Sequence, residues 1–234
     1  MGGRLVVLLS WAVGAAAHQP WSGGPTRRIS EDFFHAWFDS NAALPLYRQR
    51  PDEACEATIA FLLEWPKHEI NRRDRYDLTR QLHGFNFKAD QLYPPFFTTG
   101  PFLGFLRANW RPAIGLTIRL VNFATERVFD WLIEDPERRC GLTFQTPHGA
   151  VFWRGDMQTF YRSRYHQHTA QVITCALMAL EKWLEERLSA GEPVAESVEM
   201  LFKDGRSLAF AGVLTSAINR RLRRTQIASV AEHG

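Results

Sequence analysis

The stretch from Gln171 to Leu188, QVITCALMALEKWLEERL, constrains the fold of this chain more than any other. Its apolar residues recur every three or four positions, which is the spacing of one buried face of an α-helix. Gly191 follows closely, and glycine is common where a helix ends. The sequence therefore predicts one long amphipathic helix that stops before Gly191. Its expected core face consists of Ile173, Ala176, Leu177, Leu180, Leu184 and Leu188 with Trp183 beside them, and its expected solvated outer face consists of Glu181, Lys182, Glu185, Glu186 and Arg187.

Most other apolar segments also have helical spacing, and Pro or Gly residues separate them. Proline suits the first turn of a helix, where its missing N–H would be unpaired anyway. Pro45 is expected to interrupt the first of these patterns. The fold class predicted is mainly α, an irregular stacked helical array resembling an α-solenoid, although no exact repeat period occurs. The expected helices cover about 30–38, 51–65, 73–82, 102–109, 112–134, a short piece within 156–165, 193–202 and 208–218.

The segment from Gly141 to Gly155, GLTFQTPHGAVFWRG, breaks the helical pattern. Apolar and polar residues alternate before a PHGA turn, and an extended apolar run follows the turn. This pattern predicts one small β-hairpin near 142–154. Because an isolated hairpin is marginally stable in water, it should lie against the helices.

The N-terminal segment Met1–Ala17 has two interpretations. A basic residue, Arg4, precedes the apolar run LVVLLSWAVGAAA, which ends in small residues. This is the form of a secretory signal peptide with cleavage before His18, and a core helix of the array is the alternative. The run is too short for a membrane span. The organisation expected is an N-terminal helix and loop at 1–28, the helical array at 29–224 and a frayed tail at 225–234.

The sequence contains no recognisable pattern for catalysis, a cofactor or a metal. Gly-Lys does not occur, which excludes a Walker A loop, and GxGxxG, HExxH and GxSxG are also missing. The three cysteines form no CxxC pair. We therefore expect no catalytic, cofactor or metal site and no nucleotide site. We expect a turn position for His148, loop or capping positions for His166 and His168, and core positions for Cys55 and Cys175, while the third cysteine is Cys140.

Two basic stretches remain. Arg72, Arg75, Arg80 and His83 could form a polar site, but Asp74 and Asp77 favour a helix face with local ion pairs. The second stretch is 220–224, which contains four arginines. A formal net charge of +3 is too small to indicate nucleic-acid binding, so no nucleic acid is expected as a partner.

The motifs ALMALEKWL at 176–184 and RSLAFAGVL at 206–214 resemble a known helical-repeat region. It is the region found in very large bacterial ATP-binding proteins of the STAND-type regulatory ATPase class, and the resemblance covers residues 100 to 219. It implies a cytoplasmic helical array that binds a ligand or partner, in a family of which some members act in defence against phage. The ATPase module is missing here. The resemblance thus implies a fragment or short relative, and it favours the repeat-helix interpretation of Met1–Ala17.

Three functions are compatible with these patterns. The leading expectation is a non-enzymatic helical-repeat module that binds a protein partner and needs no cofactor. The second is a secreted or periplasmic helical protein whose signal peptide at 1–17 is cleaved. The third is an unrecognised enzyme that uses the polar site around Arg72 and His83.

Overall fold

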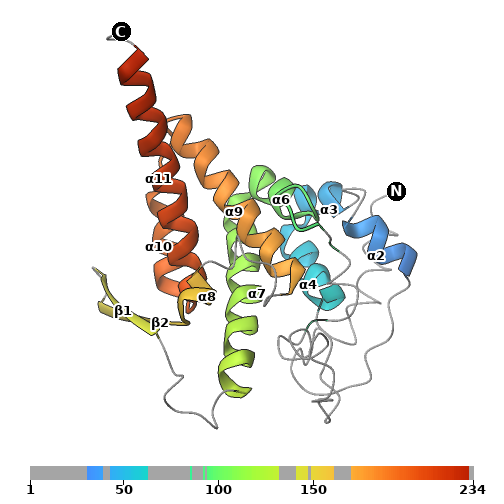
Figure 1. Ribbon diagram of the computed structural model, residues 1–234. Helices are drawn as coiled ribbons and strands as arrows, with labels where there is room; N and C mark the ends of the chain where they lie inside the picture. The colour runs from blue at the N-terminus through green and yellow to red at the C-terminus, as the bar shows by residue number, and fades with distance from the viewer. Residues whose placement is uncertain are drawn as a thin grey trace.

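The computed structural model describes residues 31–38, 43–62, 85, 92, 94–131, 141–146, 149–160 and 170–231. This part of the chain is mainly helical and carries one two-stranded antiparallel hairpin, so the predicted fold class is confirmed (Figure 1). The helices are α2 (Glu31–Phe38), α3 (Ala43–Gln49), α4 (Pro51–Leu62), α6 (Phe102–Ala108), α7 (Trp110–Trp131), α8 (Met157–Phe160), α9 (Gln171–Ser189), α10 (Ala195–Asp204) and α11 (Leu208–Ala231). The strands are β1 (Gly141–Thr146) and β2 (Gly149–Arg154).

Helices α7 and α9 hold the array together. Helix α9 packs on α6, α7 and α11, whereas α7 also packs on α4 and α10. Figure 1 shows α3, α4 and α6 on one side of α7 and the group α8, α10 and α11 on the other. The apolar face predicted for α9 from Ile173 to Leu184 is buried, which confirms the helix that the sequence singles out. Because α7 and α9 each contact several helices, the packing is irregular.

The C-terminal end of α9 follows from one glycine. Gly191 has φ of 73°, a left-handed conformation that glycine adopts without a steric penalty. The Glu192 amide donates to the Arg187 carbonyl at 2.9 Å, and the Gly191 amide donates to the Leu188 carbonyl at 3.3 Å. These two bonds form a Schellman motif, which satisfies carbonyl groups that the end of a helix would otherwise leave unpaired.

Several helix boundaries differ from those predicted. Pro45 lies in the first turn of α3, where a missing N–H costs nothing, so α3 is a helix that the sequence reading missed. Helix α7 begins at Trp110, before Pro112, and α10 begins at Ala195, after Pro193. Helix α11 continues to Ala231, through most of the region expected to fray. The predicted start of α4 at Pro51 is confirmed.

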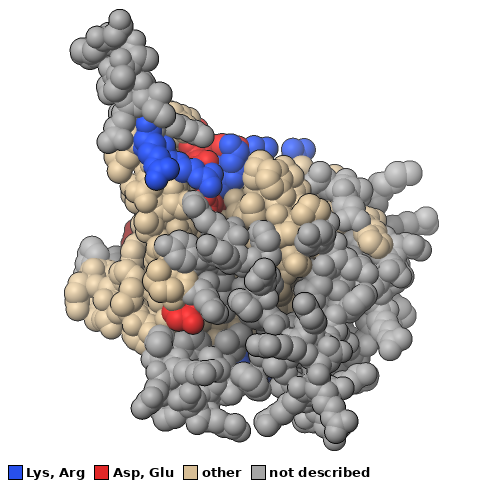
Figure 2. All heavy atoms as spheres, viewed as in Figure 1, with Lys and Arg blue, Asp and Glu red and all other residues tan. Residues whose placement is uncertain are grey.

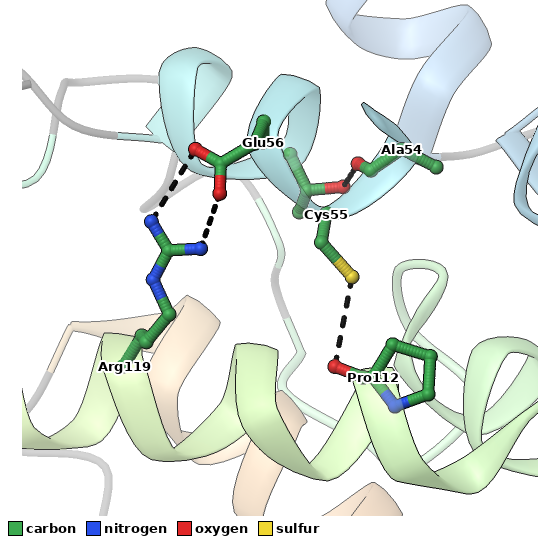
Figure 3. A network of polar contacts seen from close by, with 6 residues as sticks. Ala54, Cys55, Glu56, Pro112 and Arg119 are labelled. Carbon is green, nitrogen blue, oxygen red and sulfur yellow. Dashed lines mark hydrogen bonds and ion pairs between the residues drawn. The ribbon is translucent and has the colours of Figure 1, made fainter. Parts of the chain in front are cut away.

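Helix α4 lies along α7 and shows how neighbouring layers are fixed (Figure 3). Arg119 on α7 forms an ion pair with Glu56 on α4. On the same side, the Cys55 thiol lies 3.6 Å from the carbonyl oxygen of Pro112. Cys55 is buried, whereas Glu56 and Arg119 remain partly exposed. The buried side chains between α4 and α7 therefore contribute most of the stability of this packing, since an exposed ion pair contributes at most about 1 kcal/mol.

The hairpin packs on α10 through one tryptophan. Trp153 is fully buried and stacks on Phe202 of α10, with ring centroids 4.8 Å apart. Phe144 of β1 also contacts Trp153, with ring centroids 4.8 Å apart. The Arg154 amide also donates to the Arg206 carbonyl at 2.8 Å, so the end of β2 pairs with the segment before α11. The predicted hairpin is confirmed, including its position on the helices.

Candidate interaction surface on α11

Two carboxylates are buried where α9 meets α11. Glu181 and Glu185 are each only 4% exposed, so the prediction that they lie on a solvated outer face is wrong. They are one helical turn apart and therefore point the same way from α9. Burying a charge costs several kcal/mol unless a partner compensates for the lost hydration. The partners must come from the helix that covers this face, which is α11.

The partners are two side chains of α11, Ser216 and Arg220. The Ser216 hydroxyl donates to Glu181 Oε1 at 2.6 Å. The guanidinium group of Arg220 lies between the two acids, with Nη2 2.8 Å from Glu181 Oε1 and Nη1 2.6 Å from Glu185 Oε1. The Glu185 contact is misaligned for a hydrogen bond, so Coulomb attraction dominates there. We call Glu181, Glu185, Ser216 and Arg220 the acid clamp, because they join α9 to α11.

A more exposed ion pair lies beside the acid clamp. Arg107, in the last turn of α6, contacts Glu186 of α9 through Nη2 at 2.6 Å and through Nε at 3.1 Å. Hydrogen bonding from Arg107 lowers the pKa of the Glu186 carboxyl below its ordinary value. Both side chains are partly exposed, so water screens this pair far more than the acid clamp.

The opposite side of α11 carries apolar side chains in solvent. Ile218 is 52% exposed and Leu222 is 55% exposed, although both belong to a helix whose inner face is well buried. They are one turn apart and share one face of α11. Upstream on that face, Ala211 and Leu214 are partly buried against the core. We call Ile218 and Leu222 the exposed stripe.

Arginines flank the exposed stripe. Arg221 and Arg223 are both exposed, and they are the immediate neighbours of Leu222. Figure 2 shows Lys and Arg side chains gathered where α11 leaves the helical body, with acidic side chains among them. Figure 1 shows the same helix projecting beyond the rest of the fold to the C-terminus. An apolar stripe beside cationic groups on a projecting helix is suited to binding a macromolecule.

The two described cysteines are unsuited to catalysis. Burial raises the pKa of the Cys55 thiol to about 12 and that of Cys175 to about 11. A thiol is nucleophilic only as the thiolate, so both stay unreactive near neutral pH. Their position in the core agrees with the sequence-based expectation.

Several predicted candidates lie outside the described residues. They are Met1–Ala17, Arg72, Arg75, Arg80, His83, Cys140, His148, His166 and His168. Among the residues that the structure does describe, no group of three His, Cys, Asp or Glu side chains is placed to hold a metal ion. None of the described helices combines the length and the apolar character needed to cross a membrane.

Comparison with protein-family models gave no match, and comparison with curated proteins gave no significant match. The candidate surface therefore stands on geometry alone. Sequence reasoning identified the arginine run at 220–224 but missed its two different roles. A helical projection would have shown that Arg220 and Leu222 lie on opposite faces of one helix, since successive residues are rotated by about 100°, but not which face is buried.

Proposed function

We propose that this chain is a non-enzymatic helical module that binds another protein through the exposed stripe of α11. The observation that carries the proposal is the exposure of Ile218 and Leu222 side by side on one helix face. Single exposed apolar residues are ordinary, but adjacent ones that continue a partly buried row indicate a surface that a partner covers. The resemblance to the array of STAND-type ATPases supports the same role, and on this ground we also propose that the module belongs to a larger cytoplasmic regulatory protein.

The acid clamp gives this surface a rigid base. Ser216 and Arg220 hold one side of α11 to α9, while the exposed stripe lies on the other side. A binding helix that is already ordered loses less conformational entropy when its partner docks. The acid clamp is thus a structural contact, and its carboxylates already have their partners, which favours a binding module over an enzyme that would use these acids in catalysis.

Site-specific photocrosslinking in the native host tests the proposal. The full chain would carry p-benzoylphenylalanine at Ile218 and, as a matched control, at Lys203, which is exposed on α10. We expect one discrete protein adduct, identified by mass spectrometry, at position 218 but not at position 203. The adduct should disappear when Leu222→Asp is added. The proposal is rejected if position 218 gives no protein adduct or the same adducts as the control.

A further inference from the structure

We propose that β1 is a second interaction surface, which pairs edge to edge with β1 of a second copy of this chain. This surface lies on a different element from the exposed stripe of α11 and does not depend on it. Three features of the hairpin support the pairing: the backbone groups that β1 directs outward, the residues that its own sequence would place opposite one another, and the apolar side chain that is left in solvent beside them.

The outer edge of β1 presents backbone hydrogen-bonding groups. Residues that lie opposite each other in an antiparallel pair either exchange two backbone hydrogen bonds or exchange none, and the two kinds of pair alternate. The Arg154 amide donates to the Arg206 carbonyl outside the hairpin, so Arg154 and its partner Gly141 belong to the second kind. Alternation assigns Thr143 and Gln145 to the same kind. Their N–H and C=O groups therefore point away from β2.

This edge carries none of the usual protection against further pairing. Within the described residues the sheet consists of β1 and β2, and the bridge to Ser207 lies on the opposite edge, along β2. The β1 segment GLTFQT contains no charged residue and no proline, which are the residues that commonly block an edge strand. Figure 1 shows the hairpin at the margin of the molecule, away from α2, α3 and α4. Such an edge is suited to accept another extended strand.

The sequence of β1 is complementary to itself. In an antiparallel pair with a twofold axis at Thr143, this residue lies opposite Thr143 of the second copy, and Leu142 lies opposite Phe144 of the second copy. Threonine pairs and pairs that include an aromatic ring stabilise antiparallel sheets. Because β1 has no charge, no like charges meet across the axis. These properties select a second copy of the chain as the partner, in a symmetric dimer.

Pairing in this register would also cover an exposed apolar side chain. Leu142 is 55% exposed, although Trp153 lies directly opposite it on the same face of the hairpin and is fully buried. The helices thus cover this face under β2 but leave the Leu142 side chain of β1 in solvent. Phe144 of the second copy would lie beside Leu142 and continue the apolar row that begins at Trp153. Removing this surface from water favours the dimer.

The edge of β2 is a poorer candidate for the same contact. Its Arg154 amide is already used by the Arg206 carbonyl. The exposed Arg154 side chain would also bring a positive charge from each copy to a β2–β2 contact. The two edges of one hairpin therefore differ, and β1 is the edge that suits a second copy.

Sedimentation equilibrium of the full chain, from about 10 µM to about 1 mM, tests the proposal. A strand of six residues makes a small contact, so the dimer should be weak and should form toward the upper end of this range. The measured mass should rise toward that of two chains. Leu222→Asp alters the exposed stripe of α11 and should dimerise like the unmodified chain.

Charges placed at the axis identify the edge and its register. Thr143→Lys and Thr143→Glu should each weaken self-association about threefold to tenfold at low salt, because two like charges would lie opposite each other. A mixture of these two variants should form a mixed dimer, since their charges are opposite. Gln145→Lys is the matched control. Gln145 is exposed on the same face but would lie opposite Gly141 of the second copy, so self-association should change less than about twofold.

A disulfide provides a second measurement that does not depend on charge. The Cα atoms of a hydrogen-bonded antiparallel pair lie about 5.5 Å apart, within the range that a disulfide spans. Mild oxidation of Thr143→Cys, in a background with Cys140→Ser, should therefore link two chains rapidly. Gln145→Cys in the same background should link much more slowly, because the proposed register does not bring its two copies together.

Several results would overturn the proposal. They are a chain that stays monomeric up to about 1 mM, equal weakening by Thr143→Lys and Gln145→Lys, and a mixture of the two Thr143 variants that stays monomeric. Loss of the dimer in Leu222→Asp would assign the contact to α11 instead. Circular dichroism checks that each variant folds, and the disulfide measurement decides if the charged variants do not fold. Photocrosslinking at Ile218 judges the proposed function separately.

Discussion

Removing Arg220 should destabilise the chain more than removing any neighbouring arginine. The substitution Arg220→Met keeps most of the aliphatic stem but deletes the guanidinium group that lies 2.8 Å from Glu181 and 2.6 Å from Glu185. Both carboxylates are nearly inaccessible to solvent. Both carboxylates would then stay charged inside the protein without the guanidinium group, although Glu181 would keep the hydrogen bond from the Ser216 hydroxyl, or the end of α11 would have to separate from α9.

The expected cost is about 2–4 kcal/mol. Breaking a buried ion pair by removing one partner costs about 3–5 kcal/mol, because it leaves an uncompensated charge. The Arg220 side chain is 49% exposed, so water already screens part of the interaction and the expected cost is about 1 kcal/mol below that range. Even so, the loss is a large fraction of the roughly 5–15 kcal/mol that stabilises a typical domain.

Urea denaturation of the full chain, followed by circular dichroism, measures this cost. Arg223→Met is the matched control, and its expected effect is within about 0.5 kcal/mol because Arg223 lies in solvent. Neutralising the acids with E181Q/E185Q should destabilise the unmodified chain but stabilise the Arg220→Met variant. The reasoning is refuted if Arg220→Met matches the control, or if neutralising the acids fails to rescue it.

Three further outcomes follow from local geometry. Gly212→Ala should destabilise the chain by about 1–3 kcal/mol, because the new Cβ would lie only 1.9 Å from a carbonyl oxygen of α8. Gly115→Ala on α7 has open space around the new Cβ and should stabilise the chain by about 0.4–1 kcal/mol. Urea denaturation compares the two variants. In a variant without the third cysteine, Cys55 and Cys175 should resist a thiol reagent near pH 8 and react after unfolding, and rapid native labelling would contradict their raised pKa. Arg107→Met should cost at most about 1 kcal/mol of stability at neutral pH. This cost should vanish in acid, because Arg107 lowers the pKa of the Glu186 carboxyl and the stability gained from that shift is lost as the pH falls through the lowered pKa. A cost that does not change with pH would be inconsistent with the ion pair.

Local sequence patterns were sufficient to predict most of the helices and the hairpin of this protein. The three-to-four residue period and Gly191 were enough to place α9, because a helix needs a continuous apolar face and a residue that tolerates positive φ. The alternation in GLTFQT and the PHGA turn after it were enough to predict the hairpin, because side chains alternate between the two faces of a strand. Pro45 was misleading, since proline breaks a helix interior but is accommodated in the first turn of α3.

The roles of the charged residues on α9 and α11 depend on how these two helices pack. The apolar period of the α9 sequence and the charge of Glu181 and Glu185 predict that these two residues face solvent. In the structure α11 covers them. Nothing local to α9 indicates this, because the compensating Ser216 and Arg220 are far away in the chain. The direction from which α11 approaches α9 also decides that Arg220 points inward while Leu222 points to solvent. Burial depends on which helices meet, and the periodicity of a single helix does not encode its neighbours.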